Sequence, residues 1–191
     1  MNTSITLRLK HLLPAILLAF LAMQLQTARA DQTNTQGQLT ERDYKFVKSV
    51  LKGGSMEITL GQLASQQGTN QSVRAFGDRM VQDHQKANQE LTQLATQKGA
   101  TLEEPMNKKA DAMAAHLREL SGTEFDKAYI KMMISDHKTV IKEFQSEAAK
   151  GDDADLKNWA TQTLPTLQEH LRLAESAKAD IDSANPPISA Q

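Results

Sequence analysis

The chain has 191 residues, with 22 basic and 23 acidic side chains and no cysteine. Without cysteine, an exported form of the protein cannot rely on disulfides, and the side-chain ligands of a metal site are limited to His, Asp, Glu and Met. The basic residues form no tract, so nucleic acid is not an expected partner.

The first 30 residues have the pattern of a secretory signal peptide. A basic start at Arg8 and Lys10 precedes the apolar run Leu12–Met23, which is too short for a comfortable membrane span, and Ala28–Ala30 resembles a cleavage site. We expect an exported protein that begins at Asp31 and is not stably inserted in the membrane; the alternative is an uncleaved anchor. Removal of the signal takes away three basic residues and leaves 19 against 23 acidic ones, a net charge of −4.

The remaining residues predict helices only. Residues 31–40 are polar, and we expect them to be a disordered linker. Apolar residues then recur at spacings of three and four, and no segment alternates with the period of a strand. The expected fold is an all-α four-helix bundle over residues 41–181, followed by a disordered tail at 182–191. Its helices are expected at about residues 41–67, 70–98, 123–150 and 153–181, and the linker at 99–122 carries a shorter helical segment at about 107–120.

Residues that cap helix N-termini precede each long helix and support these boundaries. Two threonines begin capping-box patterns with an aspartate three residues later, at Thr40 and at Thr123. The full set of expected caps is Thr40, Thr69 or Asn70, Thr123, and Asp152 or Asp153.

A sixteen-residue pattern occurs twice, at Phe76–Leu91 and at Tyr129–Phe144. Each copy has an aromatic residue, then a methionine, then an Asp-His pair, and then a large apolar residue. A second match relates the first two long helices to the last two at an offset of 83 residues, which aligns Phe46 with Tyr129. We therefore predict two helical hairpins related by a pseudo-two-fold axis.

Each long helix carries one ionisable residue on its apolar face; these residues are Glu57, His84, His137 and His170. If both hairpin turns were at the same end of the bundle, the four groups would spread over about 11 Å along its axis. If the linker crosses the bundle, their heights become about 15, 21, 22 and 16 Å from the first turn. We therefore expect a crossover linker and one shared layer of polar groups. Gly54 and Gly61 flank Glu57 by one turn, where a neighbouring helix could approach closely.

Three imidazoles and one carboxylate in one layer form a candidate site for a single transition-metal ion. Such ligands suit Zn, Fe, Mn, Ni or Cu, and ligand type does not select among these metals. Asp83, Asp136 and Glu169 directly precede the histidines, so each could support a histidine of a neighbouring helix or belong to a solvated flank. The alternative to a metal is that each histidine is a core residue bonded to a neighbouring helix or to Glu57.

Three motifs are specific enough to compare with a family. They are N-x-x-V-R-x-F-G-x-x-M-V-x-D-H at Asn70–His84, G-T-E-F-D-x-x-Y at Gly122–Tyr129, which leads into M-x-x-D-H, and L-P-x-L-x-x-H at Leu164–His170. Together, over about residues 41–178, they resemble an exported bacterial family catalogued as domain of unknown function 4142. The resemblance implies a ferritin-like bundle with a crossover and a periplasmic location. It implies no reaction.

The metal-binding pattern of ferritins themselves is missing. Di-iron bundles use a Glu-x-x-His motif on each of two helices. The residues three positions before the histidines here are Val81, Ile134 and Leu167. A ferroxidase or a di-iron oxygenase is therefore poorly supported.

The sequence leaves several functions open. The first is a metal-binding protein that handles metal or oxidative stress in the cell envelope. The second is a non-catalytic interaction module of the envelope, whose histidines are core residues. A third is a bundle that loosens when its buried histidines become protonated. An enzyme is the least supported class, because no arrangement of a nucleophile and a base is visible.

Overall fold

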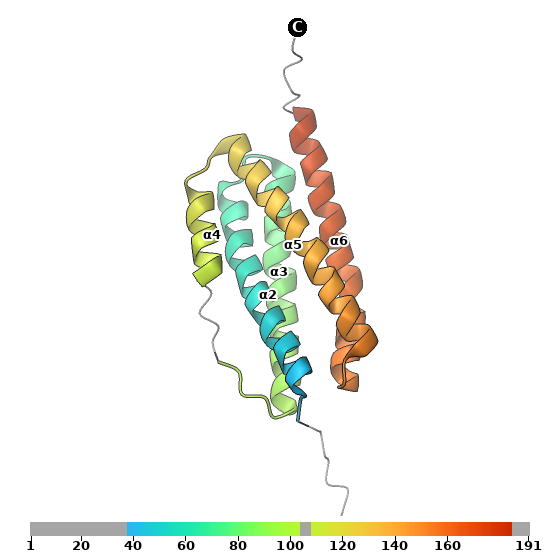
Figure 1. Cartoon of the computed structure of the whole chain (residues 1–191). Helices are drawn as coiled ribbons and strands as arrows, with labels where there is room; N and C mark the ends of the chain where they lie inside the picture. Colours follow the sequence, from blue (N-terminus) through green and yellow to red (C-terminus); the bar gives the residue numbers. More distant parts are fainter. Residues whose placement is uncertain (1–37, 104–107, 185–191) are drawn as a thin grey trace, which may run out of the picture. The chain divides into compact units, whose positions relative to one another are not determined.

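The computed structural model describes residues 38–103 and 108–184, which form five α-helices and no strand. The helices are α2 (Glu41–Gln67), α3 (Gln71–Gln97), α4 (Lys108–Arg118), α5 (Gly122–Lys150) and α6 (Ala154–Ala184) (Figure 1). The prediction of an all-α fold is confirmed. The fold is not simply a four-helix bundle, because the linker contributes the short helix α4 as a fifth.

The ends of the chain lie partly outside the described residues. These undescribed parts include the whole predicted signal peptide at 1–30, residues 31–37 of the predicted linker and residues 185–191 of the predicted tail. The tail was expected to begin at residue 182, but residues 182–184 belong to α6. Ile181 is only 2% exposed and packs in the core, which holds the last turn of the helix in place. Among the described helices, none combines the length and apolar character that a bilayer crossing requires.

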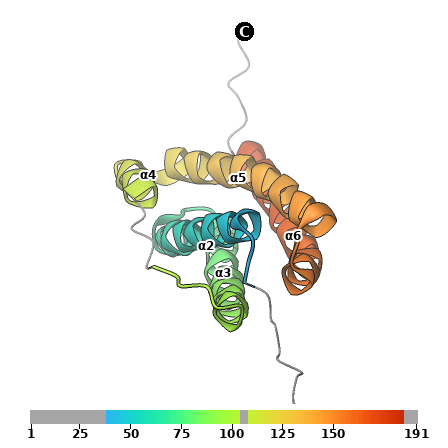
Figure 2. The same ribbon diagram turned by 60° about the horizontal axis from the view of Figure 1, so that its bottom comes forward.

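The four long helices form two antiparallel hairpins. α2 packs along α3, α5 packs along α6, and the connecting turns are residues 68–70 and 151–153. Figure 1 shows that the hairpins point in opposite directions, with the α2–α3 turn beside the start of α5. The connection from α3 to α5 therefore crosses from one end to the other. Its helix α4 packs on α2 and α5, on the side away from α6 (Figure 2).

Each turn is hydrogen-bonded to one buried aspartate of the opposite hairpin. The carboxylate of Asp126, near the start of α5, accepts hydrogen bonds from the backbone N–H groups of residues 69 and 70, at 3.0 and 2.8 Å. The carboxylate of Asp43, near the start of α2, accepts the corresponding bonds from residues 152 and 153, at 3.1 and 2.8 Å. The two aspartates are related by the same offset of 83 residues as the internal repeat, which is therefore expressed in the contacts between the hairpins.

One of the expected helix caps is wrong, at the start of α5. Thr40 and Asn70 cap α2 and α3 with their side chains, as expected, and Asp153 accepts from Leu156 at the start of α6. Thr123 does not cap α5, however. The N-cap is Ser121, which makes no side-chain capping bond. Thr123 lies inside α5, which begins one residue earlier at Gly122, so it cannot be the N-cap.

The apolar core consists of two clusters separated by a polar layer. One cluster lies around Phe76, Phe125 and Tyr129, and the other lies around Phe46 and Trp159. On α3, α5 and α6, the boundary between the two clusters falls at a histidine. The core residues on either side of it are Met80 and Leu91 on α3, Met133 and Ile141 on α5, and Leu167 and Ala174 on α6. Buried polar side chains thus interrupt the core at one level, which makes that level the place to look for a site.

The helices α2 and α3 approach closely at a pair of glycines. A Cβ atom added to Gly61 would lie 2.8 Å from the carbonyl oxygen of Gly77, and one added to Gly77 would lie 2.7 Å from the carbonyl oxygen of Gly61. Both distances are too short for a side chain, so the two backbones pack directly on each other. This contact brings Glu57, one turn before Gly61, and His84, two turns after Gly77, toward the same layer.

Candidate metal centre

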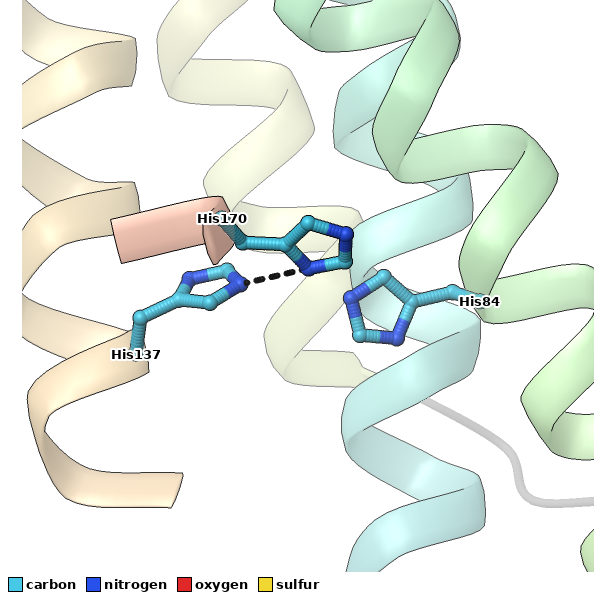
Figure 3. A group of neighbouring side chains, drawn as sticks. All are labelled: His84, His137 and His170. Carbon is cyan, nitrogen blue, oxygen red and sulfur yellow. Dashed lines mark hydrogen bonds between the residues drawn. The ribbon is translucent and has the colours of Figure 1, made fainter. Parts of the chain in front are cut away.

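Three histidines from three helices converge in the polar layer (Figure 3). His84 comes from α3, His137 from α5 and His170 from α6, and one ligand atom from each lies within 4.8 Å of the others. The ring centroids are 5.4 to 6.1 Å apart. We call these three residues the imidazole cluster.

The tautomer of His137 follows from its backbone contact. Nδ1 of His137 lies 2.9 Å from the carbonyl oxygen of Met133, one turn earlier on α5. Because a carbonyl oxygen can only accept, Nδ1–H must donate. A neutral ring carries one N–H group, so Nε2 of His137 presents a lone pair to the layer.

The tautomer of His170 follows from a carboxylate on another helix. Nε2–H of His170 donates to Oδ2 of Asp83 on α3, at 2.8 Å. Asp83 also accepts from Arg79, one turn earlier. Burial acts to raise the pKa of Asp83, but the hydrogen bonds from Arg79 and His170 leave it below its ordinary value, so the carboxylate is ionised. Nδ1 of His170 is then the atom that carries the lone pair.

Two lone pairs therefore face each other in the cluster. Nε2 of His137 and Nδ1 of His170 are 3.4 Å apart and, in the neutral tautomers fixed by Met133 and Asp83, neither has a proton to donate. Nε2 of His84 is buried and has no hydrogen-bond partner among the described residues. Figure 3 shows a nitrogen of His84 turned toward the other two rings. The cluster thus presents two lone pairs to each other beside the unpartnered Nε2 of His84, and it is completed by a proton or by a metal ion.

Burial favours the neutral form of all three rings. It lowers the pKa of His84 to about 3, with further contributions from His170 and His137, and it lowers the pKa of His137 to about 4. Burial also lowers the pKa of His170, although the hydrogen bond to Asp83 acts in the opposite direction. Neutral imidazole is the form that binds a metal ion.

The carboxylate expected in this layer lies against a second acid. Glu57 of α2 forms a separate group with Asp136 and His137 of α5, with ligand atoms within 4.8 Å of one another. Glu57 is 2% exposed, and neither of its oxygens has a hydrogen-bond partner among the described residues. Burial first, and then the charge of Asp136, raise the pKa of Glu57 well above its ordinary value. We call Glu57 and Asp136 the carboxylate pair.

A cavity of 350 Å³ joins the carboxylate pair to the imidazole cluster. Its lining includes both members of the pair together with His84, His137 and Asn88. The side-chain oxygen of Asn88 is buried and has no hydrogen-bond partner among the described residues. A metal ion held by three imidazoles would therefore have an open side toward this cavity, as catalytic and exchange sites do.

The residues that precede the histidines have three different roles. Asp83 supports His170 on another helix, whereas Asp136 lies beside Glu57. Glu169 pairs with Arg172, three residues further along α6, at 2.6 and 2.7 Å. The exposed residue His116, on α4, belongs to neither group of possible metal ligands.

Asn88 and Arg79 were not among the site residues predicted from the sequence. Asn88 follows His84 by one turn, and Arg79 precedes Asp83 by one turn. This spacing of four was the only signal available, and it is common on solvated helix faces. Each role depends on contacts between side chains that the spacing alone does not specify.

The comparisons with known proteins concern the fold and the family of the chain. A crystal structure of a DUF305 fragment from Deinococcus radiodurans has a similar fold, with a TM-score of 0.67, 14% sequence identity, and coverage of 75% of this chain and 99% of the fragment. Among curated proteins, none matches the chain. The profile of the family described as Domain of unknown function (DUF4142) matches residues 28–177. The match spans most of the sequence, and the chain therefore belongs to the DUF4142 family.

Proposed function

We propose that this protein is an exported, ferritin-like helical protein that binds one transition-metal ion and handles metal or stress in the cell envelope. The ligands are His84, His137 and His170, and Glu57 lies on the open side of the same layer. The observation that carries the proposal is the 3.4 Å contact between two ring nitrogens that both present lone pairs. A metal ion converts this mutual repulsion into two bonds and gives Nε2 of His84 a partner.

The surroundings of the cluster support the same proposal. Histidines that bind metals usually donate their second N–H group to a carboxylate or a backbone carbonyl, which orients the ring. His170 donates to Asp83 and His137 donates to Met133, so both types of support are present. Imidazole ligands suit Zn, Cu, Fe or Ni, and Mn belongs to the wider set of candidates that includes a carboxylate.

The test is a metal analysis of protein purified without chelators. We expect about one transition metal per chain, and a metal present at 100 times its Kd should stabilise the fold by about 2.7 kcal/mol. The variant His84→Ala should lose both effects. His116→Ala is the matched control, because His116 is exposed on α4, and it should retain both. Metal-free protein that shows no melting shift with Zn, Cu, Fe or Mn would refute the proposal.

One observation favours a second candidate, a non-catalytic envelope module with core histidines. Nδ1 of His137 and Nε2 of His170 are hydrogen-bonded within the protein. If the histidines serve only to make these hydrogen bonds, replacing His137 or His170 will lower the stability of the fold. The unaltered protein will then gain no stability from any metal. Cross-linking in intact cells would then identify the protein partner.

The periplasmic location is part of the proposal and has its own test. It is supported by the basic start, apolar run and small-residue site within residues 1–30. Fractionation should place the protein in the periplasm, and N-terminal sequencing should begin at Asp31. An intact N-terminus in the membrane fraction would indicate an uncleaved anchor instead.

A further inference from the structure

The carboxylate pair is an arrangement that two ionised acids would not adopt without a partner. Glu57 and Asp136 come from facing helices, and their oxygens belong to one group of ligand atoms within 4.8 Å. Neither carboxylate can donate a hydrogen bond to the other when both are ionised. A buried, unpaired carboxylate is costly, so the pair requires a shared proton or a cation.

Burial and the charge of Asp136 raise the pKa of Glu57 more than the charge of one nearby lysine lowers it. Lys109, on α4, lines the cavity, but the oxygens of Glu57 have no hydrogen-bond partner among the described residues. The oxygen of Asn88 adds another buried acceptor to the same cavity. Its position against Gly54, one turn before Glu57, is allowed only because that glycine has no side chain.

We infer that the carboxylate pair is a second cation site, distinct from the imidazole cluster and reached through the same cavity. Its ligands are the oxygens of Glu57 and Asp136, and the oxygen of Asn88 is placed to contribute from α3. Carboxylate and amide oxygens suit a hard divalent cation such as Mg²⁺, Ca²⁺ or Mn²⁺. His137 belongs to both groups, so the two sites adjoin at this residue. This inference does not depend on metal binding by the imidazole cluster.

Chemically distinct probes can measure the two sites separately. Protein is stripped of metal, given one equivalent of Zn²⁺ for the imidazoles, and then titrated with Mn²⁺ while free Mn²⁺ is followed by electron paramagnetic resonance. We expect one Mn²⁺ per chain. Glu57→Gln and Asp136→Asn should each weaken Mn²⁺ binding at least tenfold while retaining Zn²⁺. Glu143→Gln is the matched control, because Glu143 lines the same cavity outside the pair, and it should bind Mn²⁺ normally.

The other outcomes of this titration distinguish the second cation site from the proposed function. Zn²⁺ binding without Mn²⁺ binding would overturn the second site and leave the proposed function intact. Mn²⁺ binding that depends on Glu57 but occurs without Zn²⁺ binding would support the second site and contradict the proposed function. If Glu57→Gln instead weakens Zn²⁺ binding, Glu57 is a fourth ligand of the first metal and the second site is refuted. Circular dichroism melts of both variants check that they fold, and Asp136→Asn supplies the answer if Glu57→Gln does not.

Discussion

Asp43 and Asp126 make the same contact at opposite ends of the bundle, each accepting two backbone hydrogen bonds from the turn of the other hairpin. Both carboxylates are at most 2% exposed. The contact orients the hairpins in opposite directions. That orientation is what places the three histidines at one level, so the candidate site depends on it.

Replacement of either aspartate should destabilise the fold. Hydrogen bonds to charged groups contribute about 1.5–3 kcal/mol each, and an asparagine can accept only weaker ones. We expect Asp126→Asn to reduce the free energy of unfolding by about 1–3 kcal/mol, measured by urea denaturation. Asp78→Asn is the control, since Asp78 is exposed and accepts a hydrogen bond from the Ser65 hydroxyl. An equal decrease in the free energy of unfolding in the two variants would show that the buried contact contributes no more to stability than an exposed one.

Local patterns predicted the helices better than they predicted the contacts between helices. Apolar spacing and the caps at Thr40 and Asn70 locate helix ends because these are interactions within one segment. The Thr123 cap failed because α5 begins at Gly122, with Ser121 as its N-cap, and the capping-box pattern does not fix that first turn. The histidine layer could be anticipated from helix rise alone, once the linker was taken to cross the bundle.

The details of the layer could not be anticipated in that way. Helix rise places Glu57 and the histidines at similar heights but does not say which side chains touch. The structure places Glu57 beside Asp136 rather than within 4.8 Å of all three imidazoles. That outcome depends on the rotation of α2 about its axis, which the close contact of Gly61 and Gly77 sets.

A side chain at Gly77 should force α2 and α3 apart. A Cβ atom at this position would lie 2.7 Å from one backbone atom of α2 and 2.8 Å from another, and backbone cannot move aside cheaply. We expect Gly77→Ala to cost about 1–3 kcal/mol, the usual range for overpacking. Gly53→Ala is the control, because no atom lies within 4 Å of the added Cβ, and it should be neutral or slightly stabilising. Thermal melts of the two variants would settle the comparison, and equal melting temperatures would contradict the tight contact.

Glu147 should make the protein less stable as the pH rises. Burial, and then the charge of Asp43, raise the pKa of Glu147 from 4.5 to about 7, while Arg42 acts in the opposite direction. Between these values the folded state binds more protons than the unfolded state, so stability falls as pH rises from about 4.5 to about 7. The variant Glu147→Gln removes this dependence. Its stability relative to the unaltered protein should therefore increase across that window and level off above it.

Urea denaturation at several pH values measures this difference directly. Other groups titrate over the same range, but they do so in both proteins and cancel in the comparison. A difference that stays constant from pH 4.5 to pH 8 would mean that Glu147 titrates normally.

Loss of Asp83 should weaken metal binding without removing a ligand. Asp83 orients His170 through its Nε2–H group, and loss of such a partner typically costs a factor of about 10–100 in metal affinity. We expect Asp83→Ala to weaken Zn²⁺ binding by at least about tenfold in a chelator competition assay. Glu169→Ala is the matched control, because Glu169 adjoins His170 in sequence but pairs with Arg172. If both variants bind Zn²⁺ as tightly as the unaltered protein, Asp83 does not support the site.

The central claim is that three imidazoles hold one metal ion, and anomalous diffraction from a crystal of the metal-loaded protein tests it most directly. We predict one strong peak at the absorption edge of the metal, which for zinc lies at about 2.0–2.1 Å from Nε2 of His84, Nε2 of His137 and Nδ1 of His170. A peak only at the protein surface, or no peak together with a direct contact between His137 and His170, would contradict the claim.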